Sequence, residues 1–151
     1  MSNKENTHRN PTPTIDVIIT DNSNKRVLLI KRGKDPFKDL FSLPGGFVDY
    51  GEKVEDAAKR EAYEELSVKV EPIDILGVYS DPNRDPRGHI MSVTFIVRIT
   101  EGDIKSNDDA AEFKWIDLEE VEKMNLAFDH LKILLDFRKW QKKKETFWSS
   151  R

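Results

Sequence analysis

The sequence has 151 residues, of which 37% are hydrophobic and 35% are charged. This length suits one domain and excludes two full-sized ones, and the apolar residues gather in short blocks, which excludes a disordered chain. With 25 basic and 28 acidic residues the net charge is −3, so no broad cationic face is expected for duplex nucleic acid or an anionic membrane. No cysteine is present, which excludes disulfides and thiolate chemistry and makes the cytoplasm the expected location.

The first third of the chain predicts strands. Residues 1–13 are polar and end in two prolines, so we expect a flexible N-terminal arm. Thr14–Thr20 and Arg26–Lys31 are rich in aliphatic and β-branched residues, and the turn-forming Asp21–Asn24 between them predicts a hairpin. Leu40–Asp49 is apolar but contains a Pro-Gly-Gly sequence, where the backbone turns sharply or another group approaches closely.

The rest of the chain predicts a helix, more strands and a closing helix. Val54–Leu66 contains good helix formers and no glycine or proline. The later segments are expected to be strands at Ile73–Ser80, His89–Thr100 and Glu112–Leu118, a helix at Leu126–Lys143, and a C-terminal tail at 144–151. This order predicts an α/β fold with a mixed sheet between helices.

Six residues stand in a fixed spacing across the first helix: Gly46, Glu52, Arg60, Glu61, Glu64 and Glu65. On a helix the last three glutamates fall on one face, where their charges repel one another and favour a bound cation. Carboxylate oxygens suit Mg²⁺ or Mn²⁺, which bridge protein carboxylates to substrate phosphates. A merely solvated acidic face is the alternative, but six fixed positions match by chance less than about once in 10⁴ chains.

The segment Gly46–Val68, GFVDYGEKVEDAAKREAYEELSV, resembles the Nudix box of the Nudix hydrolases. That family hydrolyses a nucleoside diphosphate linked to another moiety, and the resemblance implies a Nudix-type α/β/α sandwich over residues 14–143. By this resemblance, Mg²⁺, with Mn²⁺ as a possible substitute, is bound by the carbonyl of Gly46 and by Glu61, Glu64 and Glu65. Glu52 then supports the metal site and Arg60 fixes the glutamates, in keeping with its position four residues before Glu64.

One position departs from the family pattern. Ser67 stands where the family usually has glycine, at the end of the helix, where a left-handed residue often closes the last turn. A serine in that conformation costs on the order of 1 kcal/mol, which a folded domain can absorb. We therefore expect activity to survive this departure.

The reaction we expect is displacement at phosphorus by a water that the metal has made more acidic. Its proton needs a base, and Glu64 or Glu65 could serve. The family often takes the base from a later loop, where this sequence has Asp108, Asp109 and Glu112. We place Glu112 first among these acids.

The segment Tyr79–His89 is similar to one in the small ADP-ribose pyrophosphatases of the Nudix family, which convert ADP-ribose into AMP and ribose 5-phosphate. Its side chains of Arg84, Arg87 and His89 offer donors for phosphate or ribose oxygens. In a purely structural alternative, Asp81 and Asp85 pair with these arginines and only hold the loop.

Two other functions stay open: cleavage of oxidised nucleoside triphosphates such as 8-oxo-dGTP, and a catalytically idle Nudix module that binds nucleotide. The partner we expect is a small nucleotide, and the family's ADP-ribose enzymes are often dimers, so a homodimer is one expectation. The adenine-stacking residue stays unassigned among Phe37, Phe41, Phe47 and Tyr50. The basic, aromatic C-terminal end suggests packing on the domain or on a second subunit rather than RNA binding.

Overall fold

The computed structural model describes residues 9–104 and 112–151. The elements in chain order are β1 (Thr12–Ile19), β2 (Arg26–Lys31), β3 (Phe41–Ser42), β4 (Gly45–Phe47), α1 (Val54–Leu66), β5 (Lys69–Tyr79), β6 (Ile90–Glu101), β7 (Phe113–Asp117), the 3₁₀ helix η1 (Leu118–Lys123), α2 (His130–Lys142) and β8 (Phe147–Trp148). The helix expected at Val54–Leu66 has the predicted bounds.

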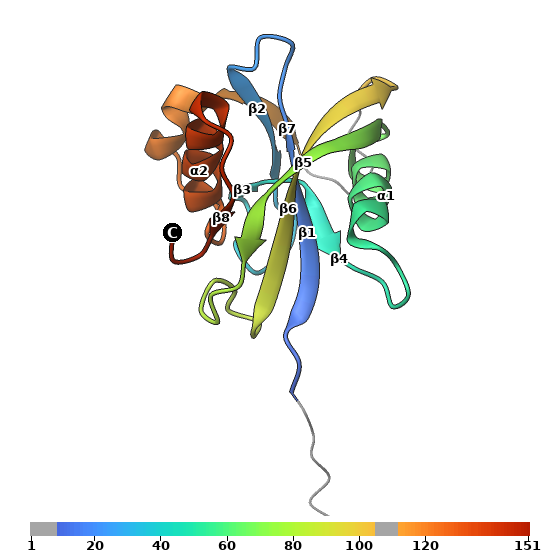
Figure 1. The fold of residues 1–151 in the computed structure, drawn as a ribbon, viewed down its shortest axis with the longest axis vertical. Helices are drawn as coiled ribbons and strands as arrows, with labels where there is room; N and C mark the ends of the chain where they lie inside the picture. The colour runs from blue at the N-terminus through green and yellow to red at the C-terminus, as the bar shows by residue number, and fades with distance from the viewer. Residues whose placement is uncertain (1–8, 105–111) are drawn as a thin grey trace, which may run out of the picture.

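The strands form a mixed sheet of five, in the order β4-β1-β6-β5-β8, and an antiparallel sheet of three, in the order β3-β2-β7. Within the larger sheet β1 runs parallel to β6 and antiparallel to β4. Helices α1 and α2 lie on opposite sides of the strands (Figure 1). This arrangement confirms the predicted α/β fold, and the three-stranded sheet is an addition that the sequence did not predict.

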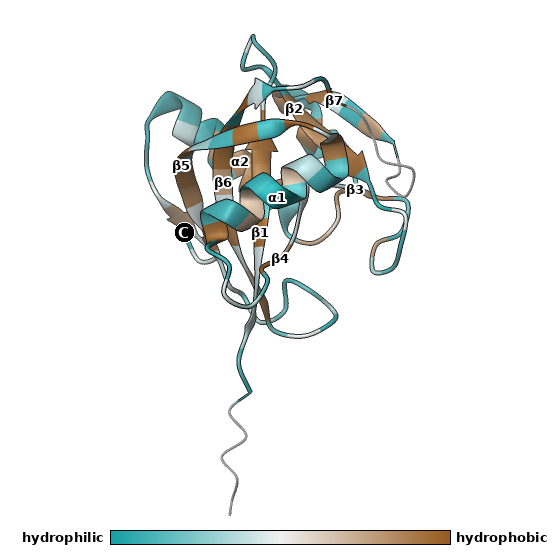
Figure 2. Cartoon of the chain, turned by 90° about the vertical axis from the view of Figure 1, so that its right-hand side faces the viewer, coloured by the Kyte–Doolittle hydropathy of each residue, from teal (hydrophilic) through white to brown (hydrophobic). Residues whose placement is uncertain are grey.

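The two faces of β1 pack against different cores. Ile15 and Val17 belong to the cluster that contains the buried alanines of α1, whereas Ile18 belongs to the cluster that contains the apolar residues of α2. The three buried alanines, at positions 57, 58 and 62, bring α1 close to the sheet. Figure 2 shows α1 lying across the largely apolar strands with polar colours on its outer side.

The end of α1 confirms the expectation about Ser67. Its φ and ψ are 60° and 30°, the left-handed conformation that glycine adopts more easily. Its backbone N–H donates to the carbonyl of Tyr63 at 2.9 Å and closes the last turn. The chain then enters β5, so Ser67 forms the turn between this helix and the next strand.

The predicted hairpin between Thr14–Thr20 and Arg26–Lys31 is wrong, except for the one residue pair next to its turn. Thr20 and Val27 form one antiparallel bridge, and the N–H of Asp21 donates to the carbonyl of Arg26 at 3.0 Å. Past this turn the strands separate, because β1 pairs with β4 and β6 while β2 pairs with β3 and β7. The turn after Thr20 was predicted correctly. Pairing with distant strands, however, places β1 and β2 in different sheets.

The C-terminal half also differs from the expected bounds. Helix α2 begins at His130 rather than at Leu126, because Phe128 has a positive φ of 53° that a helix cannot accommodate. Residues 144–151 lie against the domain: β8 pairs with β5, and Phe147 is buried. Within the described residues, no helix is both long and apolar enough to cross a membrane.

Candidate active site

The glutamates of α1 face a cavity between the helix, β1 and the β2–β3 loop. Glu65 is largely buried beside Glu61. Its pKa is raised to about 9, first by burial and then by the charge of Glu61 and a hydrogen bond with it. Burial also raises the pKa of Glu61. Glu64 is more open, with 57% of its side chain exposed. In the absence of a cation, Glu65 therefore retains a proton at neutral pH, whereas Glu64 is open to solvent.

Arg60 connects the parts of the acidic group. Its Nε and Nη2 atoms donate to the two carboxylate oxygens of Glu52 at 2.8 and 3.0 Å, and Nη1 donates to Glu61 at 2.8 Å and Glu64 at 3.1 Å. Nη2 also donates to the carbonyl of Phe47 at 2.9 Å. This fork connects the carboxylates of Glu52, Glu61 and Glu64 to the backbone of β4.

The two glycines of β4 allow the strand to approach the acidic groups. A Cβ atom on Gly46 would collide with the carboxylate of Glu61, and one on Gly45 would lie 2.6 Å from Oδ1 of Asp16. The backbone N–H of Gly45 also bonds to Glu65. The close approach predicted for the Pro-Gly-Gly sequence is thus present, and it brings the backbone of β4 beside the glutamates.

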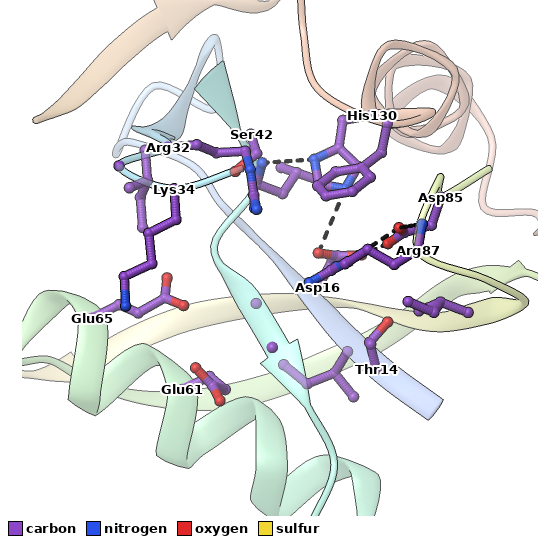
Figure 3. A pocket seen from close by; sticks show the side chains of 18 of the residues that line it. Thr14, Asp16, Arg32, Lys34, Ser42, Glu61, Glu65, Asp85, Arg87 and His130 are labelled. Atoms are coloured by element: carbon purple, nitrogen blue, oxygen red, sulfur yellow. Dashed lines mark hydrogen bonds and ion pairs between the residues drawn. The ribbon is translucent and has the colours of Figure 1, made fainter. Parts of the chain in front are cut away.

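A second polar group lies under the cavity on the side of α2. Oδ2 of Asp16 accepts a 2.6 Å hydrogen bond from Ser92, and its Oδ1 lies 3.6 Å from Nε2 of His130. Nδ1 of His130 accepts from the N–H of Leu43 at 2.9 Å, immediately before the Pro-Gly-Gly sequence. Burial lowers the pKa of His130, so its ring is neutral at neutral pH. Figure 3 shows Asp16 and His130 on the side of the cavity opposite Glu61 and Glu65.

The cavity has a volume of about 430 Å³ and is lined by charges of both signs. The acidic lining residues are Asp16, Glu61, Glu64, Glu65 and Asp85, and the cationic ones are Lys31, Arg32, Lys34, Arg84 and Arg87. This size accommodates a small ligand, and the carboxylates suit a metal ion while the cations suit anionic oxygens. Such a site suits a ligand that carries phosphate groups.

The residues fit a divalent cation. Glu61 and Glu65 lie within hydrogen-bonding distance of each other, an arrangement that requires a proton or a cation between them. Their hard carboxylate oxygens are the ligands that Mg²⁺ and Mn²⁺ prefer. Across residues 9–104 and 112–151, no three acidic or imidazole groups lie together in an arrangement that could hold a metal ion, and the side chain of Glu64 is 57% exposed.

The predicted substrate-binding residues have different surroundings. Arg84 and Arg87 both line the cavity. Arg87 pairs with Asp85 at 2.9 Å, whereas Arg84 is buried and donates two hydrogen bonds of 2.7 and 2.9 Å to Asp129. The pairing of Asp85 with Arg87 agrees with the structural alternative for this loop, but Arg84 pairs with Asp129 rather than with Asp81. His89 is not a lining residue, and its Nε2 lies 2.9 Å from the carbonyl of Ser80.

The candidate bases are not gathered in the cavity. Glu112 is exposed and does not line it, although its carbonyl accepts from the N–H of the lining residue Lys31 at 2.8 Å. Asp108 and Asp109 lie outside the described residues. The sequence analysis missed Asp16, Arg32 and His130, which line the cavity. The one available signal was Asp16, a lone carboxylate inside an otherwise apolar run, which a buried strand tolerates only when the charge has partners.

Comparison with known proteins identifies the family of the chain. A model of the NUDIX domain matches residues 10–137, and the chain therefore belongs to the Nudix family. It is a Nudix hydrolase that retains the glutamates of the motif, and Nudix ADP-ribose pyrophosphatases generally use a divalent metal ion.

The chain is similar to several known proteins. An ADP-ribose pyrophosphatase of Methanocaldococcus jannaschii is 47% identical over 131 residues, which cover 87% of this chain and 75% of the relative. The structure of the NUDIX domain of Shewanella oneidensis NrtR complexed with ADP ribose is 28% identical with a TM-score of 0.75, covering 88% of this chain and 90% of the other. A MutT/nudix family protein from Enterococcus faecalis is 32% identical with a TM-score of 0.77, covering 91% of this chain and 65% of the other.

Proposed function

We propose that the protein hydrolyses ADP-ribose to AMP and ribose 5-phosphate with Mg²⁺ as its metal. The observation that carries this proposal is that Glu61, Glu64 and Glu65 line the same cavity as Arg32, Lys34 and Arg87. A diphosphate that joins two sugars fits such a site, because its charge needs cations on both sides. The 47% identity to an ADP-ribose pyrophosphatase supports this choice of substrate.

The proposed metal ligands are the carbonyl of Gly46 and the carboxylates of Glu61, Glu64 and Glu65. When bound, Mg²⁺ would supply an acidified water and neutralise charge on the diphosphate. Arg60 holds Glu61 and Glu64 in place through its Nη1 atom, and Glu52 in turn holds Arg60. The water oxygen forms a bond to one phosphorus, the bond from that phosphorus to the bridging oxygen breaks, and the second phosphate leaves.

The proton of the attacking water must pass to a carboxylate. Glu112 stays our candidate among the acids of the later loop, because the hydrogen bond between its carbonyl and Lys31 keeps its backbone next to the cavity. Among the cationic groups, Arg87 is the proposed contact to substrate, with Arg84 and His89 as further candidates in the same loop. A cytoplasmic location and a homodimer complete the proposal.

A turnover screen with Mg²⁺ tests the proposed function. The screen offers ADP-ribose, 8-oxo-dGTP, a dinucleoside polyphosphate, NADH and a nucleotide sugar, and it identifies products by mass. We expect AMP and ribose 5-phosphate from ADP-ribose at a rate well above the others. Preference for a triphosphate would retain the chemistry and overturn the substrate, while no turnover of any compound would favour the idle binding module.

A further inference from the structure

The Leu43–Gly46 segment leads from β3 into β4 and ends among the glutamates of α1. The N–H of Gly45 bonds to Glu65, and a Cβ atom on Gly46 would collide with the carboxylate of Glu61. Gly46 is also the residue whose carbonyl is proposed above as a metal ligand. A displacement of this segment therefore changes the position of Gly46 relative to both glutamates.

Two hydrogen bonds hold the start of the segment. The carbonyl of Pro44 accepts from the N–H of Val17 in β1 at 2.9 Å. The N–H of Leu43 donates to Nδ1 of His130, at the start of α2, at 2.9 Å. Leu43 is 3% exposed and His130 is 2% exposed, which keeps solvent away from the bond between them. Because a buried N–H without an acceptor costs stability, His130 fixes the backbone of Leu43 where it lies.

The contacts of His130 define the state of its ring. A backbone N–H can only donate, so Nδ1 carries no proton and the neutral ring carries its proton on Nε2. Nε2 faces Oδ1 of Asp16 at 3.6 Å, as a dashed line marks in Figure 3. Asp16 is itself held by the hydroxyl of Ser92 at 2.6 Å and lies 3.9 Å from Nη2 of Arg84. Both nitrogens of the ring thus face fixed groups, which set its orientation.

Resting on the metal ligands proposed above, we propose that His130 is a positioning residue of the metal site, which holds the carbonyl of Gly46 in place through the backbone of Leu43. Pro44 and Gly45 are the two residues between them, and the ring of Pro44 fixes its φ, so a shift at Leu43 is passed on toward Gly46. His130 itself needs no contact with the metal ion. Removing a group that orients metal ligands typically changes metal affinity about 10- to 100-fold.

Calorimetric titration with Mn²⁺ tests this role without any substrate. His130→Leu removes the acceptor of the Leu43 N–H and should weaken Mn²⁺ binding at least about tenfold. His130→Asn supplies an amide oxygen to the same N–H and should recover most of the affinity. Phe137→Leu is the matched control, because Phe137 is buried in the same helix but does not line the cavity. Thermal unfolding shows whether each variant is folded.

Hydrogen exchange in the unaltered protein gives a second test that needs no variant. If His130 and the metal ion act on the same segment, the coupling is reciprocal. Mn²⁺ should then slow exchange of the Leu43 amide more than that of the Phe137 amide, and NMR measures both in one sample. An equal effect on the two amides would mean that Mn²⁺ acts through overall stability alone, which would overturn the inference.

The outcomes separate the role of His130 from the proposed reaction. Unchanged Mn²⁺ binding in His130→Leu overturns the inference even if ADP-ribose is hydrolysed. An equal loss in His130→Asn or in Phe137→Leu also overturns it, since the acceptor is then not the cause. A loss in His130→Leu that His130→Asn restores supports the positioning role, even if the turnover screen rejects ADP-ribose. Absence of Mn²⁺ binding by the unaltered protein overturns both the proposed metal ligands and this role.

Discussion

At the residue scale, the carboxylate of Glu65 lies in surroundings that oppose its charge. Burial and the neighbouring Glu61 both raise its pKa, and only the N–H of Gly45 favours the ionised form among the hydrogen bonds given above. A bound cation reverses this balance, since it turns the repulsion between carboxylates into coordination. The ionised carboxylate of Glu65 is therefore unfavourable in the metal-free protein, and a bound metal ion would stabilise it.

Glu64→Gln and Glu65→Gln should each lower turnover at least about a hundredfold, because an amide replaces a charged carboxylate that we propose as a metal ligand. Thermal unfolding should show that both variants fold. Glu55→Gln is the control on the same helix, since Glu55 is exposed in its first turn and does not line the cavity. Near-normal turnover in either glutamate variant would remove that residue from the mechanism.

His130 should make stability depend on pH. Its pKa is lowered in the folded protein, so the unfolded chain binds more protons as the pH falls below about 6.5. Stability contributed by the neutral ring is therefore present above that pH and is lost on acidification. Four charged groups act on the ring, namely Asp16, Asp129, Arg84 and Arg32, and the two acids oppose this lowering.

Urea unfolding at pH 7.5 and pH 5.5 checks this expectation. His130→Asn keeps an acceptor for the N–H of Leu43 without a titrating ring, so it should lose less stability between the two pH values than the unaltered protein. The comparison cancels the contributions of other titrating groups, such as Glu65, whose raised pKa acts in the opposite direction. The same pH dependence in both proteins would contradict the assignment to His130.

The residues of the site differ in how far a sequence can predict them. Glu61, Glu64 and Glu65 lie on one helix, where local geometry places them together. Asp16 and His130 are 114 positions apart in sequence and meet only because β1 and the start of α2 pack on the same cavity. The ion pair of the buried Arg84 could not be predicted from the sequence either, since its partner Asp129 lies 45 positions away.

At the element scale, α1 was predicted with its observed bounds because its helix formers and its closing residue are local signals. The start of α2 was placed too early, since the sequence does not reveal that Phe128 takes a positive φ. The pairing of β1 with β6 could not be predicted from local sequence patterns either. These strands are joined across about 78 positions, from Thr12 with Ile90 to Ile19 with Val97.

Ser67→Gly should raise the free energy of unfolding by up to about 1 kcal/mol, because glycine relieves the left-handed strain at the end of α1. Ser67→Ala keeps the strain of a Cβ atom and should bring no such gain. Denaturant unfolding measures both variants. A clear loss in Ser67→Gly would mean that the serine side chain contributes more to this turn than the strain removes.

At the scale of the whole molecule, the last residues complete the larger sheet. The side chain of Ser149 accepts hydrogen bonds from the N–H groups of Ser80 and Asp81, at the start of the loop that carries Arg87. Gly77 lies so close to β8 that a Cβ atom there would collide with the carbonyl of Phe147. The chain end therefore supports β5 and the loop that follows it.

Phe147→Ala should destabilise the protein by about 3 kcal/mol, as expected for truncating a buried aromatic residue. Trp148→Ala is its neighbouring control, because 49% of Trp148 is exposed and its loss should cost less than about 1 kcal/mol. Thermal or urea unfolding compares the two. Equal effects would mean that the segment is held by its backbone pairing rather than by the buried ring.

The residues that line the cavity come from parts of the chain that extend from Thr14 to His130, and they include residues of both β1 and β6. These groups are spread over more than a hundred positions, and we expect the pairings that bring them together to form late in folding because they join distant positions. Return of activity after dilution from denaturant should consequently lag behind the return of helical signal. The return of activity would then measure when the tertiary structure is complete.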